Sequence, residues 1–235
     1  RNKIYSIAIP FDHSRHITEI FAKVFFPLVE KSFSVDFEIP KRDMISSAKL
    51  SPLVEKLLEK HSEANKIVCV NINAGKICYL RRWPQENYVE LILGLYHRFG
   101  IKVVLVGGEG DVGYVNDFIM KLPKKINIFN FCGKLSIKEL VGLFTRSRLL
   151  ITNDSGPLHI ASIVGLPTVS FFGPETPYLY GPLGPEHHVF YEDIFCSPCI
   201  NIYNAKASSC NNNICLKSIS SEIVMKTIEE KNFLT

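Results

Sequence analysis

Short apolar runs alternate with amphipathic stretches from residue 67 onward. The runs are continuously apolar, rich in β-branched residues, and cover residues 67–72, 103–106, 126–131, 149–152 and 168–172. Runs without polar alternation are typical of parallel strands that are buried on both faces. The pattern therefore predicts five parallel strands.

The stretches between these runs have helical periodicity. Pro84 precedes the stretch 85–99, in which apolar residues recur at helical spacing until Gly100 ends it. Further helices are predicted over 112–122, over 136–147 with Ser136 as the N-cap, and over 158–164. Alternating strands and helices indicate βαβ crossovers, so we predict an α/β fold with a doubly wound, Rossmann-like parallel sheet.

Residues 1–65 follow a different pattern. A strand is predicted over 4–9, a helix over 17–30 that breaks near Pro27, and a second helix over 53–61. Because this is too little for an α/β domain of its own, we expect the remnant of an N-terminal lobe with a linker, followed by one domain over 66–235. The chain begins at Arg1 instead of Met, so we expect a fragment or a processed chain.

The composition excludes several classes of protein. With 46% hydrophobic residues among 235, the chain is neither disordered nor fibrous. Its net charge of +4 is too weak and too evenly spread to indicate nucleic-acid binding. No signal peptide opens the sequence, and no apolar run approaches the roughly 18 residues that a membrane span needs.

The seven cysteines fall into two groups. Cys69, Cys78 and Cys132 stand singly, as reduced core cysteines do. The other four form a C-x2-C pair and a C-x4-C pair, namely Cys196 with Cys199 and Cys210 with Cys215. Four thiolates at these spacings predict a structural zinc site, or less readily an iron–sulfur cluster, and the alternatives are two disulfides or free thiols. An odd cysteine count favours a reducing, cytoplasmic compartment.

Candidate chemistry lies where the predicted strands end, because ligands of open parallel sheets bind beyond the carboxyl ends of the strands. The clearest exit is the stretch 152–159. There Asp154 and Ser155 can cap the next helix, Gly156 lets a ligand approach the backbone, and His159 lies one turn further on. Free N–H groups at a helix start favour an anion such as a phosphate. The alternative is that these residues are only caps and a core histidine.

Three other exits carry suggestive residues. After the first strand come residues 73–76 and then Arg81-Arg82, which are either phosphate-binding cations or a solvated basic loop. The turn 107–111 brings Asp111 toward a ribose hydroxyl, or is a plain turn. The stretch 172–185 is rich in glycine and proline, which is typical of a lid, a pocket wall or a rigid surface loop.

Together these segments resemble the C-terminal half of the bacterial lipopolysaccharide heptosyltransferases, glycosyltransferase family 9. Their order and spacing agree over roughly residues 66–230. The matching stretches are Asn73-Ala74-Gly75, Arg81-Arg82-Trp83-Pro84, Gly107-Gly108 with Asp111, Gly133-Lys134-Leu135-Ser136, residues 153–159, Phe172-Gly173-Pro174 and residues 180–184.

The resemblance implies the C-terminal lobe of a two-lobed GT-B glycosyltransferase. Such a lobe binds a nucleotide sugar, typically ADP-heptose, and the enzyme transfers the sugar with inversion to a lipopolysaccharide-type acceptor. Arg81 and Asp154 would act electrostatically, with Arg81 at the donor phosphates, Asp154 orienting it, and Asp111 at the ribose. The donor-binding set it implies is Asn73, Gly75, Lys76, Arg81, Asp111, Gly133, Leu135, Ser136, Asp154, Ser155, Gly156 and His159.

The chain departs from the family pattern at three positions. The family usually has Lys where Arg81 stands, Pro where Ala74 stands and Glu where Asp111 stands. Its N-terminal lobe, with the carboxylate thought to be the general base, has no counterpart here, so we expect that base outside this chain. The alternatives are a non-catalytic nucleotide-binding or partner module and a four-cysteine zinc-stabilised domain.

The resemblance also sets expectations about cofactors and location. Catalysis would need no metal, because Arg81 and the helix terminus can offset the charge of a departing diphosphate. A lipopolysaccharide-type acceptor leads us to expect a cytoplasmic protein with peripheral contact at the inner membrane.

Overall fold

The computed structural model describes residues 11–23, 50–59, 67–75, 78–126, 128–201, 203–204 and 207–234. Three sequence predictions therefore lie outside the described residues: the strand over 4–9, the helix break near Pro27, and the role of Lys76.

The core of the molecule is a parallel sheet of six strands in the order β3-β2-β1-β4-β5-β6. This order follows when the chain winds outward from a central strand first to one side and then to the other. The strands are β1 (Ile67–Asn71), β2 (Lys102–Leu105), β3 (Ile128–Asn130), β4 (Leu149–Asn153), β5 (Thr168–Phe172) and β6 (His187–Tyr191). The predicted fold class is confirmed, and the five predicted strands are joined by β6 at one edge.

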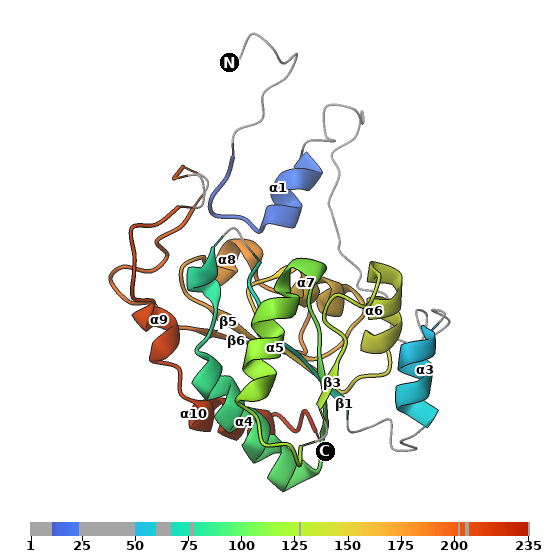
Figure 1. Cartoon of the computed structure of the whole chain (residues 1–235). Helices are drawn as coiled ribbons and strands as arrows, with labels where there is room; N and C mark the ends of the chain where they lie inside the picture. Colours follow the sequence, from blue (N-terminus) through green and yellow to red (C-terminus); the bar gives the residue numbers. More distant parts are fainter. Residues whose placement is uncertain are drawn as a thin grey trace, which may run out of the picture.

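Helices cover both faces of the sheet (Figure 1). Those near the sheet are α3 (Pro52–Glu59), α4 (Gln85–Phe99), α5 (Val112–Met120), α6 (Ile137–Phe144), α7 (Gly156–Ile163), α8 (Pro177–Tyr180), α9 (Ile214–Lys217) and α10 (Ser221–Glu230). Two short 3₁₀ turns, η3 (Tyr79–Arg81) and η4 (Glu109–Asp111), follow β1 and β2. Among the described helices, none is long and apolar enough to cross a membrane.

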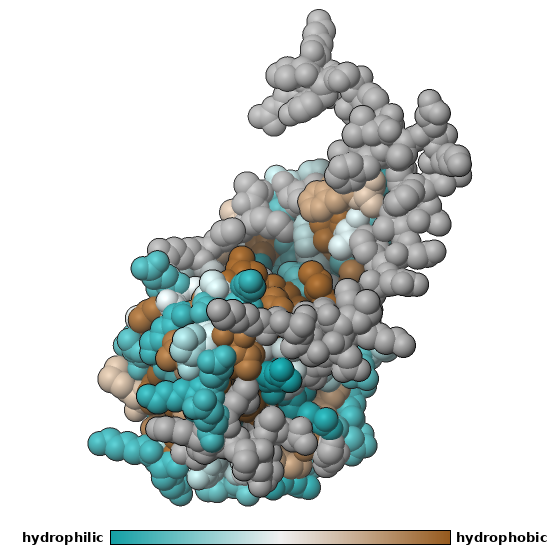
Figure 2. All heavy atoms as spheres, turned by 90° about the vertical axis from the view of Figure 1, so that its right-hand side faces the viewer, coloured by the Kyte–Doolittle hydropathy of each residue, from teal (hydrophilic) through white to brown (hydrophobic). Residues whose placement is uncertain are grey.

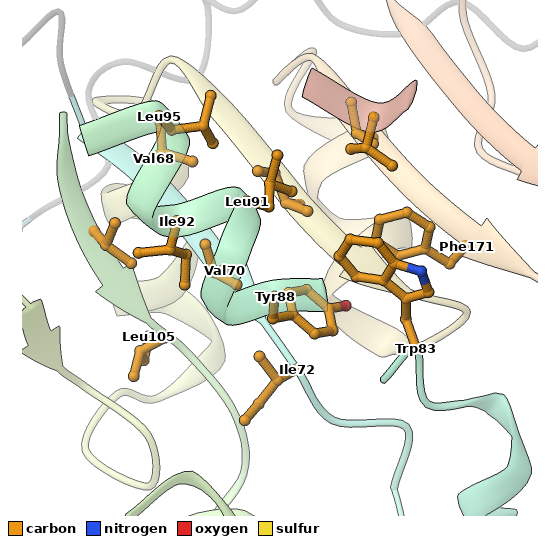
Figure 3. Close-up of a cluster of buried hydrophobic side chains, with 14 of the residues drawn as sticks. Val68, Val70, Ile72, Trp83, Tyr88, Leu91, Ile92, Leu95, Leu105 and Phe171 are labelled. Carbon is orange, nitrogen blue, oxygen red and sulfur yellow. The ribbon is translucent and has the colours of Figure 1, made fainter. Parts of the chain in front are cut away.

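One face of the sheet is covered by α4, α5 and α10. Leu91, Ile92 and Leu95 of α4 point toward the strand residues Val68, Val70 and Leu105 (Figure 3). At the end of this core nearest the start of α4, the fully buried indole of Trp83 stacks on Phe171 of β5 with 4.2 Å between ring centroids. Large, rigid aromatic contacts of this kind fix where α4 begins.

The other face is covered by α3, α6 and α7. Val54 of α3 is fully buried and belongs to the same apolar cluster as Phe144 of α6 and Ala161 of α7. This packed core thus includes residues that precede 66, and the division of the chain at residue 65 stays a prediction.

The first described helix, α1 (Ile17–Lys23), lies on the side of the molecule where α8 is found (Figure 1). The contact is specific, because Nε2 of His16 lies 3.0 Å from the carbonyl oxygen of Gly181, directly after α8.

A buried asparagine connects three strand and helix ends beneath the candidate site. Asn153, at the end of β4, accepts hydrogen bonds through Oδ1 from the backbone N–H of Trp83 (2.8 Å) and the hydroxyl of Tyr88 (3.1 Å). Its Nδ2 donates to the carbonyl of Asn73, which follows β1 (3.1 Å). Buried polar groups that are fully paired in this way specify one arrangement of the chain.

Asn153→Ala should lower the free energy of unfolding by about 2–4 kcal/mol, because it leaves the Trp83 N–H buried without its acceptor and the Tyr88 hydroxyl with only the longer bond to the carbonyl oxygen of Asn71 (3.4 Å). Urea unfolding followed by the fluorescence of Trp83, the single tryptophan of the sequence, measures this directly. Asn211→Ala, at an exposed position, is the control and should change stability by less than about 0.5 kcal/mol. Equal losses in the two variants would contradict the role of Asn153.

Candidate functional site

A cavity of about 340 Å³ opens at the carboxyl ends of the central strands. Three connections contribute to it: the segment after β1, the β4–α7 turn, and the β5–α8 loop. Its lining residues are Ala74, Gly75, Arg81, Asp154, Ser155, Gly156, His159, Glu175 and Tyr180. The structure therefore brings together six predicted site residues from two strand exits: Gly75 and Arg81, and Asp154, Ser155, Gly156 and His159.

Arg81 is held in this cavity from two directions. Its Nη1 lies 3.1 Å from Oδ2 of Asp154, and its Nη2 donates to the carbonyl oxygen of Ala74 at 3.0 Å. The Arg81 and Asp154 side chains are only 19% and 6% exposed, so water screens this ion pair weakly. The geometry agrees with the predicted role of Asp154, which orients the guanidinium group.

The N-terminus of α7 faces the same cavity without a side-chain cap among the described residues. Ser155 stands at the N-cap position, but its hydroxyl contacts Asn71 Nδ2 (2.7 Å) and Thr152 Oγ1 (3.0 Å) instead of the helix. The prediction that Asp154 and Ser155 cap this helix is therefore wrong, because side chains from β1 and β4 engage the Ser155 hydroxyl and Arg81 engages Asp154. The N–H of Gly156 remains available to an anion, whereas Pro157 has no N–H and the N–H of Leu158 donates to the carbonyl oxygen of Ser155 at 3.1 Å.

His159 completes this part of the cavity from inside the first turns of α7. Burial lowers its pKa below the usual 6.5, and the nearby His16 of the α1 segment lowers it further, whereas the charge of Asp154 acts in the opposite direction. The imidazole of the free protein is therefore neutral at pH 7, and an added negative charge would favour its protonation.

A second, apolar cavity of about 210 Å³ adjoins the first, and Gly156 lines both. Its walls come from the exits of β2 and β3 and from α6 and α7, and include Val106, Gly107, Gly108, Phe131, Leu135, Ile137, Leu140, Pro157 and Ile160. Figure 2 shows apolar surface gathered in the middle of the face on the side of α3 and α6, between hydrophilic areas. Of the three donor-binding residues that the sequence predicts in the turn 133–136, Leu135 alone lines this cavity.

Four predicted site residues build the surrounding turns. Gly133 adopts a φ of 73°, and a Cβ there would lie 2.7 Å from Val112. Ser136 caps α6 in a reciprocal pair with Glu139. The carboxylate of Asp111 accepts from the N–H of Gly108 (3.3 Å), and Asn73 Nδ2 donates to the carbonyl of Val106 (3.3 Å). The ribose contact of Asp111 thus stays a prediction.

Sequence reasoning missed Glu175 and Tyr180 as lining residues of the first cavity. Glu175 is only 2% exposed. The signal for both lay in the glycine- and proline-rich stretch after β5, which the sequence predicted to be a lid, a pocket wall or a rigid surface loop, without selecting a residue.

The four clustered cysteines do not form a metal site as they lie. None of the seven cysteines forms a disulfide, and within the described part of the chain no three His, Cys, Asp or Glu side chains are arranged to hold a metal ion. The surroundings of Cys215 are consistent with a protonated thiol: burial, followed by Cys199, Cys196 and Cys210, raises its pKa to about 11. The zinc site stays a prediction.

Two known heptosyltransferases are similar to this chain in sequence. The lipooligosaccharide heptosyltransferase 2 of Campylobacter jejuni is 25% identical over 223 residues, which are 94% of this chain and 67% of that protein. The lipopolysaccharide heptosyltransferase 2 of Escherichia coli is 31% identical over 111 residues, which are 46% of this chain and 32% of that protein.

Solved structures have the same fold. A family 9 glycosyl transferase from Veillonella parvula matches with a TM-score of 0.67 and 25% identity, over 95% of this chain and 62% of the other. The Escherichia coli heptosyltransferase WaaC with ADP matches with a TM-score of 0.65 and 16% identity, over 97% of this chain and 61% of the other. The chain thus spans about 60% of the length of these two proteins.

The chain also matches a protein family as a whole. Residues 4–208 match the family described as glycosyltransferase family 9 (heptosyltransferase). This region includes every strand of the sheet and both cavities. The chain therefore belongs to glycosyltransferase family 9, the heptosyltransferase family.

Proposed function

We propose that the two cavities bind the nucleotide-sugar donor of a heptosyltransferase-type reaction. One observation carries the proposal: a fixed guanidinium group and an uncapped helix N-terminus converge on the same cavity. Both features attract a diphosphate, the first by charge-assisted hydrogen bonds and the second by oriented N–H groups.

The adjoining apolar cavity suits the base of the nucleotide. Its walls are aliphatic and aromatic, and it shares Gly156 with the polar cavity, so a base and a diphosphate can occupy the two cavities at once. Solved structures of WaaC contain ADP in one case and ADP-2-deoxy-2-fluoro heptose in another. ADP-heptose is accordingly the donor that we propose for this chain.

The reaction that fits this site is transfer with inversion. An acceptor hydroxyl attacks the anomeric carbon and its proton passes to a general base, which we expect outside this chain. The bond from that carbon to the diphosphate oxygen breaks, and nucleoside diphosphate leaves with the bonding electrons. Arg81 and the N–H of Gly156 at the start of α7 stabilise the negative charge that develops on the leaving diphosphate. By family membership, the acceptor that we propose is a lipopolysaccharide-type glycan.

Arg81→Ala should weaken ADP binding by about 10- to 100-fold, since a charge-assisted hydrogen bond contributes about 1.5–3 kcal/mol. Arg81→Lys keeps the charge but loses the planar fork of the guanidinium group. Its affinity for ADP should therefore fall between those of the wild type and Arg81→Ala. Isothermal titration calorimetry with ADP measures both effects.

The matched control for Arg81 is Arg98→Ala on α4, because Arg98 pairs with Glu229 on α10 and lines neither cavity. Thermal midpoints of all variants separate lost binding from lost folding. Equal ADP affinity in the wild type and Arg81→Ala would contradict the proposed function.

Binding of ADP should take up protons through His159. A bound diphosphate raises the lowered pKa of this buried imidazole, so affinity should rise as pH falls from 7.5 toward 6. Calorimetry in two buffers of different ionisation enthalpy measures the proton uptake. The phosphate of ADP also titrates, so part of the proton uptake does not come from His159. The proton uptake of His159→Gln gives this baseline. Identical proton uptake in the wild type and this variant would exclude His159 from the site.

A further inference from the structure

Glu175 is an acidic side chain in a cavity that we assign to an anionic ligand. It is 2% exposed and lines the cavity together with Arg81 and His159. A carboxylate accepts hydrogen bonds and repels phosphate. In a cavity that we assign to a nucleotide sugar, its position therefore suits the hydroxyl-bearing portion of the ligand and not the phosphates.

The strand order places Glu175 at one end of the binding region. The apolar cavity lies at the exits of β2 and β3, whereas Arg81 and the start of α7 follow β1 and β4, which are adjacent central strands. Glu175 follows β5, the next strand on the far side of β4. A base at β2 and β3 and a diphosphate at β1 and β4 thus leave the β5 exit for the sugar.

The turn that carries Glu175 is held firmly. The backbone N–H groups of Cys199 and Ile200 both donate to the carbonyl of Pro174 at 2.9 Å, and the Ser197 hydroxyl donates to the carbonyl of Gly173 at 2.5 Å. A Cβ on Gly173 would lie 2.6 Å from the sulfur of Cys215, so the loop after β6 and the start of α9 pack closely on this turn. A carboxylate on such a support is preorganised and loses little freedom on binding.

We propose that Glu175 recognises the sugar of the donor by accepting hydrogen bonds from its hydroxyl groups, which makes it a specificity-determining residue. This inference rests on the proposed nucleotide-sugar function. It predicts opposite behaviour for two ligands. The negative charge of Glu175 contributes nothing favourable to the binding of a bare diphosphate. With a nucleotide sugar, its carboxylate accepts a hydrogen bond from a sugar hydroxyl.

The test is calorimetric titration of the wild type and Glu175→Gln with ADP and with ADP-heptose. We expect Glu175→Gln to bind ADP-heptose at least tenfold more weakly, while its affinity for ADP stays within twofold or rises. Glu175→Asp, which shortens the reach but keeps the charge, should also weaken ADP-heptose binding and leave the affinity for ADP within twofold. Glu192→Gln, at an exposed position, is the matched control and should bind both ligands as the wild type does.

The remaining outcomes overturn the inference. Equal weakening of ADP and ADP-heptose binding in Glu175→Gln would show a purely structural role, and no change with either ligand would show no role. A wild-type protein that binds ADP without any gain from the sugar would remove the sugar contact but leave the nucleotide site intact. A wild-type protein that binds neither ligand would overturn the proposed function itself.

Discussion

The arrangement of the site depends on the buried side chain of Asn153. It connects the end of β4 to the segment after β1 and to the start of α4. Arg81 lies two residues before one of its partners, Trp83, and Asp154 directly follows Asn153. The same set of hydrogen bonds that secures the helix start thus brings the guanidinium and the carboxylate within 3.1 Å of each other. Stability and the geometry of the site have a common origin here.

Some residues at the strand exits build the turns, and others line the cavities. Gly133 stands where the chain passes close to Val112, and Ser136 caps α6, so both shape the surroundings without lining either cavity. Arg81 and the first turn of α7 provide charge and N–H groups, and the apolar walls lie beside them. The proposed role of Glu175 is to accept hydrogen bonds from the sugar, which the binding of a diphosphate alone does not require.

Much of the fold follows from local patterns in the sequence. α4 begins and ends at the predicted residues, because Pro84 precedes it and Gly100 adopts the left-handed conformation after it. β6 was missed since it is an edge strand in which Phe190 alone is buried, and it therefore lacks the continuously apolar run of the inner strands. The motifs also identified the residues that meet around α7.

Other features of the site depend on contacts between distant segments, which local patterns do not contain. The hydroxyl of Ser155 turns toward Asn71 and Thr152 because three strand and turn segments converge there. The burial of Glu175 likewise depends on residues 197–200, which hold its turn from more than twenty positions along the chain.

We propose that a diphosphate binds between Arg81 and the N-terminus of α7, with the base in the apolar cavity. The decisive measurement is a crystal structure of this chain with ADP. We expect phosphate oxygens within about 2.7–3.2 Å of the Arg81 guanidinium and of the Gly156 N–H, and adenine against Leu135 and Ile160. A diphosphate bound away from both groups would contradict it.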